Sequence, residues 1–79
     1  MRVSLLNVIL LLQADVGAAE SVAAAVSQIP GVVHTAVTSG PYDVIGHVER
    51  DNEDGSGEVL DAVRQIDGLA RLCVCRAVQ

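Results

Sequence analysis

The first apolar run of the chain is hydrophobic at odd and even positions alike. It spans Val3–Gln13, and this pattern predicts a β-strand that is covered on both faces. Helices in one small domain cover only one face of a sheet. We therefore expect a second copy of the sheet to cover the other face.

The next segment has the spacing of an amphipathic helix. Apolar side chains recur one turn apart at Val22, Val26 and Ile29. Asp15 is a good N-cap, so the helix is expected to begin at Asp15 or Gly17. It should stop near Gln28, because Pro30 disfavours helical geometry at the residue before it.

The second half of the chain repeats the arrangement of the first. The segment Val26–Val32 resembles Val63–Leu69: each is a helix end, a glycine suited to the left-handed C-cap, and a strand start. The second helix is expected over Glu58–Ile66, with one apolar face formed by Val59, Val63 and Ile66. The remaining strands are expected at Val32–Thr38, Tyr42–Glu49 and Leu69–Val78.

This order of elements is βαββαβ. Two right-handed βαβ halves give an α+β, ferredoxin-like sandwich: a four-stranded antiparallel sheet with both helices on one face. At this length we expect a single domain, residues 1–79, with no helix-turn-helix. The fold alone does not specify a function.

The composition narrows the function. The net charge is −5, there is no lysine, and the five arginines are scattered, so we expect no direct binding to nucleic acid. Hydrophobic residues make up 51% of a short chain, and association would bury this excess. The sequence therefore predicts at least a dimer.

Two segments have alternative interpretations. The run Val3–Leu12 after Arg2 loosely resembles a secretory signal peptide, but it is too short for a membrane span, and the architecture requires a strand there. We expect a cytoplasmic protein without a membrane partner. The acidic stretch Asp51–Glu58 fails as a calcium loop, because Arg50 would occupy the first ligand position, so a solvated loop is expected.

The cysteines and histidines give no strong sign of chemistry. Cys73 and Cys75 stand two apart on the last strand and are expected to be free thiols that pack on one face. A metal pair is conceivable, with His34 and His47 as further ligands, but such sites usually need more ligands. We expect no metal, no cofactor and no catalytic residue.

The turn between the two middle strands carries the candidate site. It contains Gly40, Pro41, Tyr42 and Asp43. Gly40 can take a positive φ and Pro41 fixes φ, so a tight hairpin is one interpretation. The other is a loop that presents backbone groups and the Asp43 carboxylate to a small ligand.

These residues resemble a known family. Ile29–Val32, Thr38–Ile45 and Ile66–Leu69 are similar, in order and spacing, to the effector-binding domain of the Lrp/AsnC transcriptional regulators, also called the RAM domain. The chain looks like a stand-alone RAM protein. The resemblance implies dimers that pair their sheets face to face, rings of dimers, and amino-acid effectors bound in clefts between dimers.

The resemblance also implies an effector site at Gly40, Pro41, Tyr42 and Asp43. An effector's ammonium would pair with Asp43, and its carboxylate with backbone N–H groups near Gly40. The family often has Thr-x-Thr on the last strand, where this chain has Leu72 and Val74. This departure favours a more apolar ligand, or none.

Three functions follow from these features. The first is a non-enzymatic module that binds a small molecule, an amino acid or related metabolite, and oligomerises in transcriptional regulation. The second is a structural partner that forms mixed assemblies with full-length Lrp/AsnC regulators without an effector. The third is a small enzyme or metal carrier, which is disfavoured because Gln13–Gly17 lacks the Cys-x-x-Cys of a copper chaperone.

Overall fold

The computed structural model describes residues 6–50 and 54–77. The elements are β1 (Leu6–Ala14), α1 (Ala19–Ser27), β2 (Val32–Val37), β3 (Val44–Arg50), α2 (Asp54–Arg64) and β4 (Leu69–Arg76). The predicted order is confirmed. The first three residues of the predicted first strand, Val3 to Leu5, lie outside the described residues. Val78, the predicted end of the last strand, lies outside them as well.

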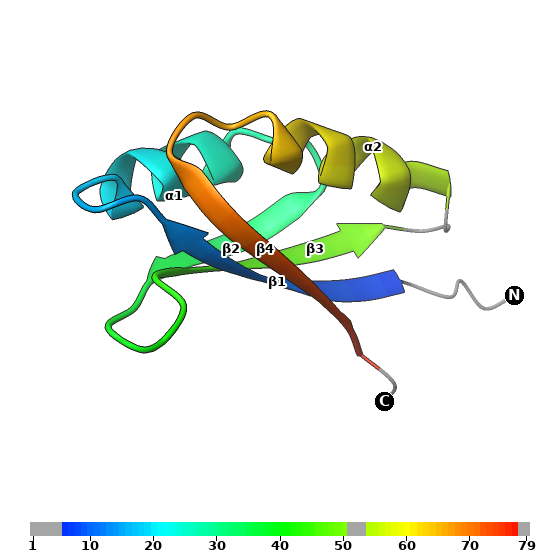
Figure 1. Cartoon of the computed structure of the whole chain (residues 1–79). Coiled ribbons are helices and arrows are strands. Elements are labelled where there is room, and N and C mark those ends of the chain that lie inside the picture. Colours follow the sequence, from blue (N-terminus) through cyan, green and yellow to red (C-terminus); the bar gives the residue numbers. More distant parts are fainter. Residues whose placement is uncertain (1–5, 51–53, 78–79) are drawn as a thin grey trace, which may run out of the picture.

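The four strands form one antiparallel sheet in the order β2-β3-β1-β4. Both helices cover the same face, and the opposite face carries neither (Figure 1). We call this opposite face the open face. The predicted ferredoxin-like α+β fold is confirmed, because each βαβ half places its helix on the same side.

The core lies between the sheet and the helices. It is built almost wholly of valine and leucine, with side chains that are at most 4% exposed: Val8, Leu10, Leu12, Val22, Val26, Val44, Val48, Val59 and Val63. The predicted helical faces are confirmed, since all four helix valines are in this set and Ile29 and Ile66 pack against its edge. On β1 the even positions face the helices, so the odd positions lie on the open face.

Gly46 shows how closely α1 approaches the sheet. A Cβ at this position would lie 3.3 Å from Cγ1 of Val26, and both residues are buried. A side chain here would therefore push the helix away from the strand.

The starts of both helices differ from the predictions. α1 begins at Ala19 rather than at Asp15 or Gly17, because Gly17 has a φ of +81°, which a helix does not allow. Ala18 is the N-cap and has no side-chain hydrogen bond, so the prediction that Asp15 caps the helix is wrong. Asp15 instead accepts a hydrogen bond from Ala18 N–H at its carbonyl, 2.9 Å.

α2 begins one turn before the predicted Glu58. Residues 54–57, assigned to a solvated loop, are helical, and residues 51–53 lie outside the described residues. Glycine weakens a helix but does not forbid one, and acidic residues favour its first turn. The prediction gave too little weight to the stabilising effect of acidic residues in the first turn of a helix.

The two turns from helix to strand match the internal repeat. Gly31 has a φ of +100° and Gly68 a φ of +90°. Both are in the left-handed region that favours glycine after a helix. A Cβ at Gly68 would also lie 3.0 Å from Cβ of Ala18, so this turn packs directly against the start of α1.

Gly68→Ala is expected to lower the free energy of unfolding by about 2 kcal/mol, from left-handed strain and overpacking together. The melting temperature should fall by roughly 8–16 °C for a domain of this size. Gly57→Ala is the matched control, since that position is helical and has no atom within 4 Å of an added Cβ. It should leave the melting temperature unchanged or raise it. Equal effects of the two substitutions would contradict this account.

Candidate functional site

The turn from Thr38 to Asp43 connects β2 to β3. Thr38 N–H donates to the carbonyl oxygen of Asp43, 2.8 Å, and closes the hairpin. The Thr38 hydroxyl donates to the carbonyl oxygen of Tyr42. The turn is therefore held at its base, while its tip at Ser39, Gly40 and Pro41 is exposed.

Asp43 links this turn to the central strand. Its N–H donates to Leu12 O, 2.8 Å, and its carboxylate Oδ2 accepts from Ala14 N–H, 2.9 Å. The pairing of β1 with β4 is irregular between Gln13 and Ala14. The Asp43 carboxylate accepts the hydrogen bond of the Ala14 N–H, which in a regular sheet would go to a strand carbonyl. Within the described residues, Oδ1 accepts no hydrogen bond.

The fold itself does not require a glycine at Gly40. Its φ is not positive, so the freedom that glycine has to take a left-handed conformation is not used there. No atom lies within 4 Å of a Cβ added at this position. Any need for a bare backbone at Gly40 must come from a molecule outside the chain.

The tip of the turn leaves backbone donors available. In the described part of the chain, no hydrogen bond is formed by the N–H groups of Ser39, Gly40 and Tyr42. The carbonyl of Pro41, by contrast, accepts from Gln13 Nε2, 2.8 Å. The turn from Thr38 to Asp43 thus contains both hydrogen-bond donors and a carboxylate oxygen that have no partner among the described residues.

Gln13 and Ala14 were not predicted as site residues. They come from the far end of β1 and reach the turn only because β1 pairs with β3. Leu72, one of the two positions where the family has threonine, pairs with Leu12 and packs against the core. Val74, the other, pairs with Leu10 and is 41% exposed.

The open face is apolar at its centre. Register places Ala36, Ile45, Leu11 and Cys73 in one row across the four strands. Ile9 lies in the next row, beside Cys75. Apolar side chains thus span the sheet on the side that has no helix.

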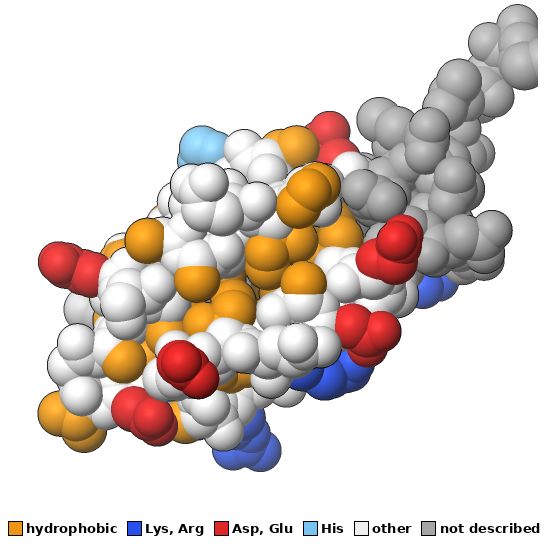
Figure 2. All heavy atoms as spheres, turned by 90° about the horizontal axis from the view of Figure 1, so that it is seen from above, with side chains coloured by type: hydrophobic (Ala, Val, Ile, Leu, Met, Phe, Trp, Pro, Cys, Tyr) orange, Lys and Arg blue, Asp and Glu red, His pale blue; other side chains and the backbone are white. Residues whose placement is uncertain are grey.

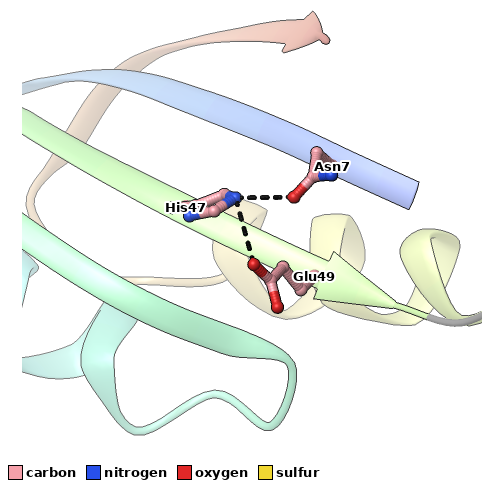
Figure 3. A network of polar contacts seen from close by, with 3 residues as sticks. All are labelled: Asn7, His47 and Glu49. Atoms are coloured by element: carbon pink, nitrogen blue, oxygen red, sulfur yellow. Dashed lines mark hydrogen bonds and ion pairs between the residues drawn. The ribbon is translucent and has the colours of Figure 1, made fainter. Parts of the chain in front are cut away.

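Polar groups gather at one end of the open face. His47 Nε2 lies 2.9 Å from Asn7 Oδ1 and 3.9 Å from Glu49 Oε2 (Figure 3). Asn7 and Glu49 are directly opposite each other on β1 and β3. Asn7 interrupts the apolar run of the first strand, and that interruption was the sequence signal for this cluster.

Cys73 and Cys75 are free thiols, as predicted. The pKa of Cys75 is raised, chiefly by desolvation. Repulsion from the neighbouring Cys73 and a hydrogen bond with its thiol raise it further. The thiolate is the reactive form of cysteine, so the raised pKa lowers the reactivity of Cys75 near neutral pH. Within the described residues, no three His, Cys, Asp or Glu side chains form a group that could hold a metal ion.

A shallow hollow of about 140 Å³ lies on the helix side of the molecule. It lies between the end of α1 and α2 and is lined by Ile29, Pro30, Glu58, Val59 and Ala62. Figure 2 views this side and shows hydrophobic side chains along its middle, with acids and arginines around them. The hollow is away from the turn and contributes nothing to the candidate site. No described helix is long and apolar enough to span a membrane.

No family model and no curated protein matches the sequence. Solved structures match over most of the chain. TTHA0845 from Thermus thermophilus has a TM-score of 0.86 at 17% identity, covering 94% of both chains. E. coli AsnC has a TM-score of 0.82 at 16% identity, and the match covers 94% of this chain and 51% of AsnC.

A third match shows the limits of this similarity. The E. coli Tat proofreading chaperone NapD has a TM-score of 0.82 at 20% identity, covering 100% of this chain and 83% of NapD. A regulator and a chaperone thus share the fold, and at these identities the matches establish the fold and no function. The resemblance drawn from the turn residues is confirmed at that level: this chain has the fold of a RAM-like domain, as found in about half of AsnC.

Proposed function

We propose that this chain is a non-enzymatic module that self-associates and binds a small molecule in transcriptional regulation. The observation that carries the proposal is the open face. Helices cover one side of the sheet, while the centre of the other side is a band of Ile9, Leu11, Ile45 and Cys73. Burying such a band is favourable at about 25 cal/mol per Å² of apolar surface.

A second copy of the chain is the partner that this face fits. The same apolar rows on two copies can pack face to face, as sheets do in a β-sandwich. The net charge of −5 does not oppose this pairing locally, because Glu49, the acid that the described strand register places on the open face, lies at its end. The dimer, and any ring of dimers, follows the arrangement that the RAM resemblance implies.

The turn supplies the ligand site of this module. Asp43 Oδ1 offers one anionic acceptor for an ammonium group, and the N–H groups of Ser39, Gly40 and Tyr42 are donors for a carboxylate. An amino acid or related metabolite presents both groups. The bare backbone at Gly40, which the chain itself does not need, allows the ligand or a neighbouring subunit to approach closely.

A thermal-shift screen with the twenty L-amino acids at 10 mM tests the ligand site. A ligand with a dissociation constant of about 0.1 mM would stabilise the protein by about 2.7 kcal/mol, or roughly 10–20 °C. Gly40→Val should abolish this shift and leave the melting temperature without ligand unchanged, because the position is open and its φ is not positive. Ser39→Ala, which keeps the backbone N–H, is the matched control. A full shift in Gly40→Val would contradict the site.

Two observations favour a second function, a partner module without an effector. The Asp43 carboxylate is already half engaged by Ala14 N–H, and Leu72 and Val74 replace two hydroxyls that the family often has. In this case the open face would pair with a full-length Lrp/AsnC regulator. Native mass spectrometry of the mixed proteins distinguishes the two: mixed dimers without any amino-acid shift would favour the partner module.

A further inference from the structure

Two histidines lie side by side on the open face. His34 of β2 is directly opposite His47 of β3, and His47 is opposite Ile9, which in turn pairs with Cys75. One row therefore crosses all four strands and contains two imidazoles next to apolar neighbours. Directly opposite side chains on antiparallel strands are about 4.5–5.5 Å apart at Cβ, so the two imidazoles are neighbours on the same face.

The two imidazoles have different surroundings. His47 is one-third exposed and contacts Asn7 Oδ1 and, at 3.9 Å, Glu49 Oε2 (Figure 3). Both contacts are acceptors, so Nε2–H of His47 donates. His34 is exposed and forms no hydrogen bond or ion pair with the described residues.

Few other charges face this row. Glu49, with a side chain that is 42% exposed, is the acid beside it. Cys75 on β4 is a thiol with a raised pKa and adds no charge near neutral pH. Asp43 and Arg71 lie at the opposite end of the sheet, and Arg76 pairs with Val8, whose side chain faces the helices.

We propose that protonation of His34 and His47 weakens the pairing of two copies through the open face. This inference rests on the proposed function and adds its regulation. Two paired copies bring four imidazoles and two Glu49 carboxylates into one interface. Uncharged imidazoles can be buried beside Ile9, the residue directly opposite His47, at little cost. Protonated imidazoles would leave a positive excess in a desolvated apolar surface.

The expected size follows from proton linkage. Glu49 partly compensates a charge on His47, so we count only the His34 of each copy. An imidazole that must stay neutral in the complex weakens binding on acidification, by up to about tenfold per pH unit. Two of them, the His34 of each copy, predict a dissociation constant that rises by up to about 100-fold per pH unit as the pH falls.

Sedimentation equilibrium at pH 7.5, 6.5 and 5.5, at constant ionic strength, tests the proposal with the wild-type chain. The variants are His34→Gln, His47→Gln and the double variant, which keep polarity without the titration. The double variant should change its dissociation constant less than about threefold over this range, since no imidazole remains to titrate. Glu49→Gln removes the compensating charge and should make the pH dependence steeper. Circular dichroism at each pH establishes that the subunits remain folded.

The outcomes separate this inference from the proposed function. A wild-type chain that is monomeric at pH 7.5 contradicts the open-face pairing, and the inference fails with it. A dimer with the same dissociation constant at both ends of the range overturns the inference and leaves the pairing intact. Dissociation at pH 5.5 that persists in the double variant also overturns it.

Discussion

Leu11→Glu is expected to convert the assembled protein into a folded monomer. Leu11 lies on β1 at the centre of the open face, between Ile45 and Cys73. A carboxylate there would be buried without a partner if two sheets packed together, at a cost of several kcal/mol for each copy. Losing about 3 kcal/mol weakens a dissociation constant more than 100-fold. The monomer should keep its circular dichroism spectrum, because the side chain does not point into the core.

Ala24→Glu is the matched control for this substitution. It introduces the same charge on an exposed position of α1, on the other side of the molecule. Assembly should be unchanged in this variant. A second comparison is Leu10→Ala, one position away from Leu11 but facing the helices, which should cost about 2–5 kcal/mol of folding stability. Monomers in both charge variants, or in neither, would contradict the assignment of the interface.

Asp43→Asn is expected to separate ligand binding from the structure of the turn. The amide keeps an oxygen that can accept from Ala14 N–H, so the melting temperature without ligand should change little. The charge that pairs with an ammonium group is lost. Losing one charge-assisted hydrogen bond costs about 1.5–3 kcal/mol, roughly ten- to a hundredfold in affinity.

Asp43→Ala completes the comparison, because it removes the acceptor as well as the charge. The Ala14 N–H is then left without its partner, which should cost about 1–3 kcal/mol of stability. Isothermal titration with the amino acid that shifts the wild-type melting temperature measures the affinity of each variant. A stability loss in Asp43→Asn with unchanged affinity would show that the carboxylate serves the hairpin alone.

The arrangement of the core was predictable because its determinants are local. Valines one helical turn apart, at Val22 and Val26 and again at Val59 and Val63, predicted the buried faces. Gly31 and Gly68 predicted the turns into β2 and β4 because a left-handed C-cap favours glycine. These features depend on a few neighbouring residues.

The site was less predictable because it depends on pairing between distant strands. Whether Asp43 bonds to its own turn or to Ala14 is decided by the register of β1 against β3 and by the irregularity at Gln13, and neither is visible in the turn sequence. The φ of Gly40 could not be predicted from the turn sequence either. Turn chemistry allows a positive φ there but does not require it, and the folded chain does not use it.

The contact between Asn7 and His47 is another consequence of register. Asn7 breaks an apolar run and His47 belongs to a different strand, and only the pairing of β1 with β3 brings them within 2.9 Å. A polar residue inside an apolar strand is the signal that a sequence offers in such a case. The partner of that residue requires the folded chain.

Sedimentation velocity of the wild-type chain at 10 µM and pH 7.5 tests the central claim most directly. The claim is that the apolar open face is buried by another copy. We expect a dimer or a larger species and no dominant species at 8.2 kDa. A stable 8.2 kDa monomer at that concentration would contradict it.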